Sequence, residues 1–192
     1  MPYRAAANKT RSTGAITLKR APGRIGVISD THGVINLDVL NALRGCQLIL
    51  HAGDIGHAAI IDRLADDSGA EVIAIRGNND SAGKWPLDDH DVLEGLDETA
   101  AIEIEGEIIA MEHGHRIWDT CHYHERLRQR HPGARLIVYG HTHIRVIDTE
   151  IYPWVVNPGA AGRERTKDGP SCLIIDTASP DWSIEELKFP KT

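Results

Sequence analysis

Five short polar segments carry the side chains that could do chemistry, and each follows a short apolar run. They are Asp30-Thr31-His32, Gly53-Asp54, Gly77-Asn78-Asn79-Asp80, His113-Gly114-His115 and Gly140-His141-Thr142-His143. Carboxylates, imidazoles and an amide, with no thiolate among them, suit borderline divalent ions such as Mn, Fe, Co, Ni or Zn. Taken alone, an aspartate after a strand is usually a turn former, and a single histidine is usually packed or solvated. It is the ordered set that predicts a metal site.

Seven donors from these segments are candidate metal ligands. They are Asp30, His32, Asp54, Asn78, His113, His141 and His143. Seven ligands can fill eight positions around two cations if one carboxylate is shared, and Asp54, central in chain order, is the natural bridge. Two cations about 3.5–4 Å apart clamp the attacking and leaving oxygens of an in-line displacement at phosphorus. The pattern therefore indicates phosphoester hydrolysis, in which a hydroxide bridging the two metals would attack phosphorus and no nucleophilic side chain is needed.

The apolar runs before these segments predict the elements that position them. Residues 24–29, 47–51 and 71–76 are expected to form buried strands, and residues 36–43 and 58–66 the helices between them. Strands and helices that alternate at this spacing imply right-handed crossovers and a parallel sheet. In such sheets, groups just beyond the carboxyl ends of the strands converge on one crevice.

The second half of the chain is richer in strands. Residues 99–104 and 107–111 should form a hairpin through Glu105-Gly106, and residues 119–129 a polar helix. Further strands are expected at residues 134–139, 144–147, 151–156, 171–176 and 183–189. We therefore expect an α/β fold of two partly mixed sheets, packed face to face with helices outside, in a single domain.

Charge and composition narrow the function classes. The chain has 192 residues and a net charge of −7, and its first 24 residues hold six basic residues and no acidic one. The acidic remainder argues against sequence-independent binding of long nucleic acids, because that mode depends on neutralising phosphates with Lys and Arg. We expect residues 1–23 to be a basic, flexible extension and residues 24–192 to form the folded domain.

Nothing in the chain indicates a membrane or secreted protein. No apolar run approaches the roughly 18 residues of a transmembrane helix, and the N-terminus lacks the apolar stretch of a secretory signal. The three cysteines, Cys46, Cys121 and Cys172, are never spaced as C-x-x-C, so they support neither a disulfide framework nor a thiolate zinc site. We expect reduced thiols in a cytoplasmic protein.

The five segments, followed by Asn157-Pro158-Gly159, resemble those of the calcineurin-like metallophosphoesterases, specifically the small bacterial and archaeal phosphodiesterases of the YfcE and MJ0936 type. The resemblance covers roughly residues 24–189 and implies a four-layer α/β/β/α sandwich with a dinuclear metal centre at one end. It implies two sets of ligands. The first metal would be held by Asp30, His32, Asp54 and His143, and the second by Asp54, Asn78, His113 and His141. The cofactors would be two divalent ions, with Mn preferred and Fe, Ni, Zn or Co as alternatives.

The third segment departs from the family pattern. Many larger relatives have a histidine where this chain has Asn79, and that histidine can assist the leaving group. An amide cannot donate a catalytic proton at ordinary pH. We therefore expect esters with acidic leaving groups, or the use of His115 or a metal-bound water as the acid. The glycine before His115 permits a turn that would aim its ring at phosphate, so His115 joins Asp54 and Asn78 as a catalytic candidate.

The remaining histidines have simpler interpretations. His51 should be a buried packing or supporting residue, and His57 lies near the expected cleft. His122, His124 and His131 flank a strongly polar helix and are expected to be solvated. A charged loop at residues 163–167 has no clear motif, although an arginine there could meet phosphate.

Two further functions compete with a phosphodiesterase that acts on a small phosphoester. One is a protein-binding scaffold with a vestigial metal site, because the retromer subunit Vps29 is similar to this family. The intact set of seven donors favours an enzyme over that scaffold. The other is a nuclease, against which the acidic body and the lack of an added capping domain both argue. The sequence leaves the oligomeric state open, with a homo-oligomer among the alternatives.

Overall fold

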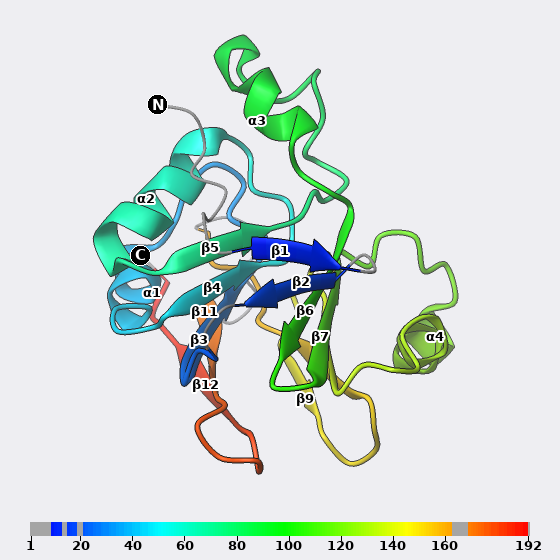
Figure 1. The fold of residues 1–192 in the computed structure, drawn as a ribbon. Coiled ribbons are helices and arrows are strands. Elements are labelled where there is room, and N and C mark those ends of the chain that lie inside the picture. Colours follow the sequence, from blue (N-terminus) through cyan, green and yellow to red (C-terminus); the bar gives the residue numbers. More distant parts are fainter. Residues whose placement is uncertain (1–8, 13–14, 19–20, 163–168, 192) are drawn as a thin grey trace.

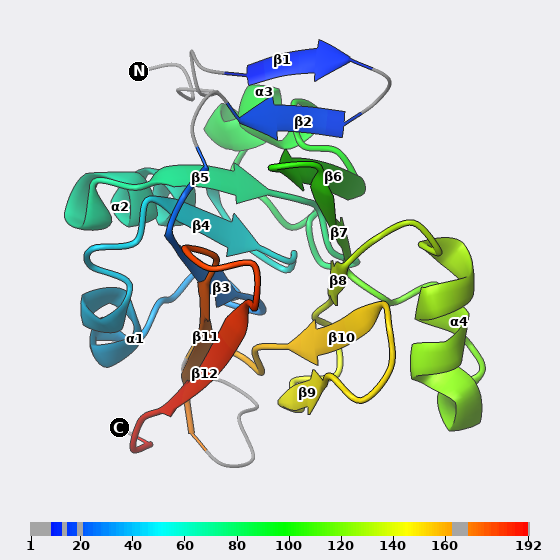
Figure 2. The same ribbon diagram turned by 60° about the horizontal axis from the view of Figure 1, so that its bottom comes forward.

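Two β-sheets packed face to face form the centre of the molecule, and helices cover both outer faces (Figures 1 and 2). The computed structural model describes residues 9–12, 15–18, 21–162 and 169–191. Helices α1 (Leu37–Ala42) and α2 (Ala58–Ser68) lie outside one sheet, and α4 (Tyr123–Arg130) lies outside the other. The expected four-layer α/β/β/α sandwich is confirmed. The charged loop at residues 163–167 and much of the basic head lie outside the described residues.

The five-stranded sheet has the order β12-β11-β3-β4-β5. Its strands are β3 (Arg24–Ile28), β4 (Leu48–His51), β5 (Glu71–Ala74), β11 (Ser171–Asp176) and β12 (Ser183–Lys188). Strands β3, β4 and β5 run parallel, with α1 and α2 as their crossovers, as the alternation of apolar runs predicts. The side chain of Asn36 caps α1 by accepting hydrogen bonds from the backbone N–H groups of Asp38 and Val39.

The seven-stranded sheet has the order β1-β2-β6-β7-β8-β10-β9. Its strands are β1 (Lys9–Ser12), β2 (Ala15–Leu18), β6 (Thr99–Ile104), β7 (Glu107–Glu112), β8 (Leu136–Val138), β9 (Val146–Asp148) and β10 (Trp154–Asn157). The hairpin between β6 and β7 turns at Glu105 and Gly106, both with positive φ, as a two-residue turn requires. Short helices η1 (Leu87–Asp89) and α3 (His90–Glu94) precede β6, and η2 (Thr120–His122) leads into α4.

Alternation along the strands divides the apolar side chains between the layers. Ile25 and Val27 of β3 pack into the core between the two sheets, whereas Ile28 packs under α1 and α2. A third, smaller cluster that includes Leu127 of α4 covers the outer face of the seven-stranded sheet. The apolar contact between the two sheets is therefore the rigid centre of the fold, and the loops that follow the strands extend from it.

Strands β1 and β2 are not anticipated by the sequence analysis. Strand β2 pairs in parallel with β6, and Ile16 of β2 lies opposite Ile102. The side chain of Ile16 is only 7% exposed and joins the core between the sheets, with Leu18 packed against it. Too few large apolar residues occur in this basic segment to signal a strand, and the pairing depends on a partner far along the chain. The boundary between an extension and a domain at residue 24 stays a prediction.

The described helices include none that is long and apolar enough to cross a membrane. All three cysteines are free thiols, with Cys46 and Cys172 buried and Cys121 exposed. Burial raises the pKa of both buried thiols, to about 12 for Cys172. The buried pair belongs to the hydrophobic layer under α1 and α2, so these thiols act as small apolar side chains.

Ion pairs join α4 to the neighbouring strands. Asp148 Oδ2 on the edge strand β9 lies 2.7 Å from Arg128 Nη2 and 3.1 Å from His124 Nδ1. His131 Nε2 lies 2.8 Å from Glu112 Oε2. The expectation that His124 and His131 are solvated is therefore wrong, because acidic side chains on adjacent strands face them. His122, which is 60% exposed and pairs with Asp119, fits the expectation better.

We predict that Asp148→Asn lowers the free energy of unfolding by about 1 kcal/mol at neutral pH, the upper end for a partly exposed ion pair. Burial alone would raise the pKa of Asp148, but Arg128 and His124 outweigh it and hold the pKa below its ordinary value. Such a carboxylate stabilises the fold above the pKa of the unfolded chain, and this stabilisation is lost as the pH falls through the lower folded value.

Urea denaturation of both proteins across the acidic range measures this effect. The difference in stability between the wild type and Asp148→Asn should shrink only below about pH 4, where the carboxylate begins to take up a proton. A difference that stays constant down to the acid transition would contradict the assigned role of Asp148.

Candidate metal centre

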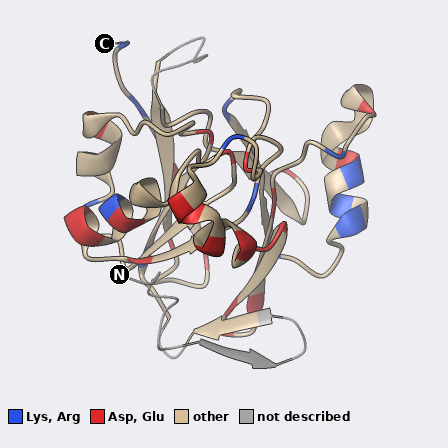
Figure 3. Ribbon diagram, turned by 90° about the horizontal axis from the view of Figure 1, so that it is seen from above, with Lys and Arg blue, Asp and Glu red and all other residues tan. Residues whose placement is uncertain are grey.

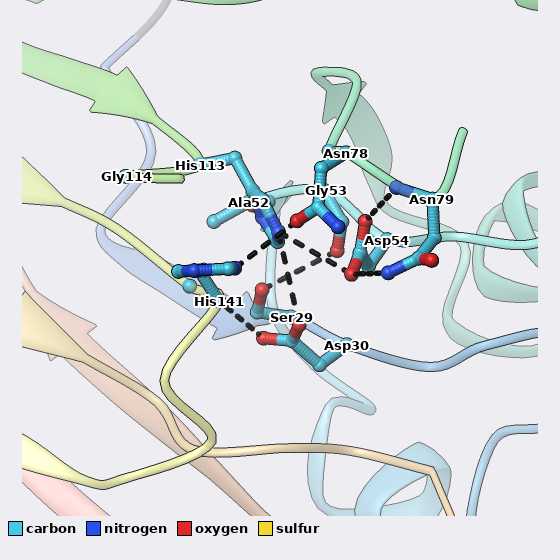
Figure 4. A network of polar contacts seen from close by, with 12 residues as sticks. Ser29, Asp30, Ala52, Gly53, Asp54, Asn78, Asn79, His113, Gly114 and His141 are labelled. Atoms are coloured by element: carbon cyan, nitrogen blue, oxygen red, sulfur yellow. Dashed lines mark hydrogen bonds and ion pairs between the residues drawn. The ribbon is translucent and has the colours of Figure 1, made fainter. Parts of the chain in front are cut away.

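The polar segments predicted from the sequence meet at one end of the two sheets. Strands β3, β4, β5, β7 and β8 each end beside this site, and hydrogen bonds between the loops fix their relative positions. The backbone N–H of Asp30 donates to Gly53 O at 3.0 Å, and that of His32 donates to Asp54 O at 2.9 Å. Figure 4 shows the side chains of Asp30, Asp54 and His113 directed toward a common centre.

Backbone strain is concentrated at this site. In the described part of the chain, six residues other than glycine have a positive φ angle, and five of them are predicted ligands. These five are Asp30, His32, Asp54, His141 and His143. Left-handed conformations cost an L-residue on the order of 1 kcal/mol or more each, and such costs collect where function requires a particular side-chain direction. The strain therefore marks these loops as functional independently of the side-chain chemistry.

Asp30 is the centre of the first group. It is fully buried, and its Oδ1 atom lies 3.2 Å from His143 Nε2 and 4.0 Å from His32 Nε2. The two ring nitrogens lie 3.4 Å from each other. One carboxylate oxygen and two imidazole nitrogens therefore face one small volume, as they do around a shared cation.

Asp54 stands between this group and a second one. Its side chain is 2% exposed, and Oδ2 lies 3.4 Å from His113 Nε2 and 3.8 Å from His32 Nε2. Asp30, Asp54 and His113 also offer ligand atoms that lie within 4.8 Å of one another. This position between two histidines supports the expectation that one carboxylate is shared.

Asn78 and His141 lie at the open edge of the site. His141 Nδ1 is 3.0 Å from Asn78 Oδ1, and the His141 backbone N–H donates to Asp30 Oδ2 at 3.1 Å. The His141 ring centroid lies 5.4 Å from that of His113. All seven predicted ligands are thus brought together, with Asn78 and His141 beside the two tight groups and more exposed than their buried members.

Two glycines are needed for this close approach. A Cβ on Gly77 would lie 2.4 Å from the backbone N of Asp54, and a Cβ on Gly140 would lie 3.0 Å from Ala52 O. The same atoms would also collide with the side chains of Asp54 and Ser29. The glycines that open the third and fifth polar segments therefore allow neighbouring loops to touch.

The buried donors fit divalent cations. Among the residues that the structure describes, Asp30 Oδ1 and His113 Nε2 are buried without a hydrogen-bond partner. His113 Nδ1 donates to Ala52 O at 2.7 Å, so in the neutral ring the lone pair of Nε2 points at the carboxylates. Buried polar atoms without a hydrogen-bond partner are uncommon in folded proteins, and a bound ion would explain these two. The hydrogen bond from Nδ1 also fixes the ring of His113, as metal-binding histidines require.

The charges of the side chains at the site also favour a bound cation. Burial would lower the pKa of His113, but Asp54 and Asp30 raise it above its ordinary value. Burial would raise the pKa of Asp54, but His113 and Asn79 bring it well below its usual range. Burial and the neighbouring His113 lower the pKa of His141, which favours the neutral ring that binds metals. The ionised carboxylate of Asp54 beside these imidazoles forms a site that positive charge stabilises.

His115 lies beside the metal ligands. Its ring centroid is 5.6 Å from that of His113 and 6.3 Å from that of His141. Burial and then the charge of His113 lower the pKa of His115. The turn at Gly114, with φ of 94°, allows this placement. Contact of His115 with phosphate stays a prediction.

Several buried residues hold the ligand loops in place. His51 is fully buried, as expected, and lies 2.9 Å from Thr31 Oγ1, which in turn donates to Ile55 O. Burial lowers the pKa of His51 to about 4, so the ring is neutral. His57 Nε2 donates to Gly33 O at 2.8 Å, which makes it a support of the first loop. Asn157 Nδ2 donates to Gly140 O at 2.7 Å and steadies the loop of His141.

Asp80 is a buried residue beside the site that the sequence analysis names only as part of a segment. Its side chain is 6% exposed. Four N–H groups donate to its two oxygens, and the shortest donor–oxygen distance of each lies between 2.8 and 3.0 Å. The donors are the backbone N–H groups of Ile55, Gly56 and Gly77 and the indole N–H of Trp85. Asp80 thereby joins the loop of Asp54 to the loop of Asn78. The only sequence signal is an acidic residue three positions after Gly77, which is common in turns.

Comparisons with known proteins agree with this geometry. A profile of the calcineurin-like phosphoesterase superfamily domain matches residues 24–180. Phosphodiesterase MJ0936 of Methanocaldococcus jannaschii is 27% identical over 171 residues, which are 83% of this chain and 96% of that protein. A solved structure described as a novel archaeal phosphodiesterase has a TM-score of 0.64 and 24% identity, and the match covers 85% of this chain and 99% of that one.

A structure of wild-type Vps29 complexed with Zn²⁺, from Entamoeba histolytica, is also similar. Its TM-score is 0.57 with 21% identity, and the match covers 87% of this chain and 99% of that one. At this level of identity the likeness shows the fold alone. The profile match spans most of the chain, so the chain belongs to the calcineurin-like phosphoesterase superfamily, a class of hydrolases.

We predict that Asp80→Asn weakens metal binding by about 10–100-fold, the usual effect of removing a group that orients ligands. The amide keeps the shape of the side chain but has only one acceptor oxygen. Its two N–H groups would face the N–H groups that donate to Asp80 in the wild type. Titration of the folded protein with Mn²⁺, followed by the electron paramagnetic resonance signal of free Mn²⁺, measures the affinity.

Trp85→Phe is the matched control for this experiment. It removes one of the four donors to Asp80 and keeps an aromatic ring in the core. It should lower Tm slightly and leave the metal affinity unchanged. If Asp80→Asn lowers Tm while the folded protein binds Mn²⁺ as the wild type does, Asp80 supports only the fold.

Proposed function

We propose that the protein is a metal-dependent phosphodiesterase that hydrolyses a small phosphoester at this site. The observation that carries the proposal is the pair of buried carboxylates, Asp30 and Asp54, that face three histidine Nε2 atoms, with Asp30 Oδ1 and His113 Nε2 left without hydrogen bonds in the described protein. Donors of this kind, in a protein of this superfamily, support two divalent ions as cofactors. Mn is our first choice, and Fe, Co, Ni and Zn are alternatives, because oxygen and nitrogen donors without a thiolate suit all of these ions.

The ligand assignment that we propose is the one that the family resemblance implies. Asp30, His32, Asp54 and His143 would hold the first ion, and Asp54, Asn78, His113 and His141 the second. When bound, two such ions lower the pKa of a water molecule into the neutral range and neutralise charge on phosphoryl oxygens. No protein nucleophile is required, which fits the placement of Cys46 and Cys172 in the hydrophobic layer.

Asn79 and Lys84 orient the shared carboxylate. The backbone N–H of Asn79 donates to Asp54 Oδ1 at 2.7 Å, and its amide Nδ2 donates to Asp54 Oδ2 at 2.6 Å. The ammonium group of Lys84 donates to Asn79 Oδ1. With both ends of its amide engaged, Asn79 holds Asp54 in place and offers no proton to a leaving group. This supports the proposal that good substrates have acidic leaving groups, or that His115 or a water molecule supplies the proton.

We predict that Asn79→His increases the rate on esters with poor leaving groups. An imidazolium at this position can protonate the departing oxygen, and general acid catalysis of this kind is worth on the order of 100-fold or more. The measurement is the ratio of kcat/KM for a methyl p-nitrophenyl phosphodiester to that for dimethyl phosphate. Asn79→Ala serves as control and should not improve the alkyl ester. An unchanged ratio in Asn79→His would contradict this account of the leaving group.

A protein-binding scaffold is the alternative that the fold comparison keeps open. The similar Vps29 structure is a complex with Zn²⁺, so metal binding by itself does not separate a scaffold from an enzyme. Hydrolysis that depends on the proposed ligands does separate them. The nearly complete burial of Asp30 and Asp54 supports a bound cation under either function, because desolvated carboxylates are costly without one.

Removal of metal provides the test. After chelation and resupply of Mn²⁺, the wild type should hydrolyse bis(p-nitrophenyl) phosphate, and Asp54→Asn should lose about two orders of magnitude or more in rate because it disturbs both ions. His122→Asn, at an exposed histidine away from the site, is the matched control and should behave as the wild type. Stoichiometric metal without hydrolysis would favour the scaffold.

The charge distribution supports a small substrate over a nucleic acid. Figure 3 shows acidic residues on α2 and near α3, whereas basic residues gather on α4. The three arginines of α4 pair with acidic groups, Arg126 with Asp119, Arg128 with Asp148 and Arg130 with Glu112. A long polyanion would meet few unpaired cations on this helix, so a small phosphoester is the better partner.

A further inference from the structure

Lys84 is an exposed cation beside the proposed metal centre. Its ammonium group donates to Asn79 Oδ1, and Nδ2 of the same amide donates to Asp54 Oδ2 at 2.6 Å. Asp54 Oδ2 is also the oxygen that lies 3.4 Å from His113 Nε2. Figure 4 shows the side-chain nitrogen of Asn79 directed toward Asp54, with the side-chain oxygen on the far side. Two hydrogen bonds and one amide group therefore place Lys84 Nζ within about 8 Å of this carboxylate oxygen.

The backbone at Lys84 is fixed to the loops of the site. The backbone N–H groups of Lys84 and Trp85 donate to Ser81 O at 2.9 and 3.0 Å. The side chain of Trp85 is 4% exposed, and its indole N–H donates to Asp80 at 2.9 Å. Because Asp80 also binds the backbone beside Asp54, the backbone of Lys84 has a defined position relative to the carboxylate, whereas its side chain can move at the surface.

The charge of Lys84 is not neutralised by a carboxylate in the described part of the chain. The acceptor of its ammonium group there is the neutral amide of Asn79. Arg116, which follows His115, differs in this respect because it pairs with Glu98 at 2.7 Å. An ammonium group has three N–H donors, so two of those of Lys84 remain for a ligand. A simple phosphodiester carries one negative charge, at the reacting phosphorus, whereas a substrate with a second negative charge close by would match this cation.

The chemistry of the leaving group points to the nature of that second charge. Asn79 offers no proton, so the proposed function favours a leaving group that departs without one. A phosphate monoester meets this condition, because its second pKa is about 6 and it leaves as a stable anion. Negative charge grows on the leaving oxygen in the transition state, so a cation on that side of phosphorus is where it accelerates the reaction.

We propose that the substrate is a diphosphate diester, in which the reacting phosphorus is joined through an oxygen to a second phosphoryl group, and that Lys84 binds this second group. The inference rests on the proposed hydrolysis at phosphorus. The oxygen of a water molecule forms the new bond to phosphorus, and the bond from that phosphorus to the bridging oxygen breaks. The bridging oxygen leaves with the second phosphoryl group, so each half of the substrate becomes a phosphomonoester. The protons of the water pass to the products or to solvent.

Two substrates with the same methyl group on the reacting phosphorus test the proposal. Dimethyl diphosphate releases methyl phosphate, and the methyl p-nitrophenyl phosphodiester releases p-nitrophenol, a neutral acid of similar strength. The measurement is the ratio of kcat/KM for the diphosphate to that for the aryl ester, which cancels any loss of folded or metal-loaded protein. Lys84→Gln should lower this ratio about tenfold or more, the scale of a hydrogen bond between charged groups. Lys84→Arg should restore most of it.

The matched control is Lys191→Gln, at an exposed lysine near the end of the chain, and it should leave the ratio unchanged. The same ratio in the wild type and Lys84→Gln would overturn the proposal. So would a wild type that hydrolyses the aryl ester and not the diphosphate, although that result would leave the proposed phosphodiesterase in place.

A second variant separates substrate binding from support of Asn79. Lys84→Gln keeps an N–H group that can donate to Asn79 Oδ1, whereas Lys84→Met removes both the donor and the charge. If Lys84 only held Asn79 in place, Lys84→Gln would behave as the wild type and Lys84→Met would slow both substrates by the same factor. We expect instead that both variants lower the ratio alike, and that Lys84→Gln binds Mn²⁺ as the wild type does.

Binding measurements separate this proposal from the proposed activity. The P,P′-dimethyl ester of methylenediphosphonic acid, which has a methylene group in place of the bridging oxygen, and methyl methylphosphonate are titrated into the Mn²⁺-loaded protein by calorimetry. A preference for the diphosphonate that falls about tenfold in Lys84→Gln supports the site even if no substrate is hydrolysed, an outcome that would overturn the hydrolase alone. An equal preference in both proteins would overturn the role of Lys84 and leave the activity unaffected.

Discussion

Two carboxylates with almost no access to solvent lie beside three histidine Nε2 atoms, and the rest of the structure serves this arrangement. Burying two carboxylates such as Asp30 and Asp54 is costly without a compensating positive charge nearby. The left-handed backbone of both residues adds a further cost. The apolar contact between the sheets lies directly beneath the loops, and its stabilisation of the fold offsets these costs.

The sequence alone predicted most of the scaffold, for physical reasons. Strands β3, β4 and β5 are continuous apolar runs, and the capping residue Asn36 marks the start of α1, so these elements follow from local patterns. The position of the candidate ligand loops could be predicted because parallel strands bring their carboxyl ends to the same edge of a sheet. The seven candidate ligand positions could be named for the same reason, since each follows a strand that the pattern identifies.

What the sequence could not supply depends on partners distant in the chain. Ile16 lies in a polar, basic segment and becomes a core residue only by pairing beside Ile102. His124 becomes half-buried only because Asp148 lies opposite it on β9. Asp80 has the appearance of an ordinary turn residue until four donors from three different positions in the fold surround it.

The proposed metal centre would draw its ligands from loops of both sheets, and this would affect the entropy of the unfolded chain. His32 follows a strand of one sheet and His143 follows a strand of the other, and 111 positions separate them in the sequence. A cation that joins them closes a loop of more than half the chain, and the entropy lost by an unfolded chain on such closure grows with loop length. The same ions that would act on phosphorus therefore also tie the two halves of the sandwich together.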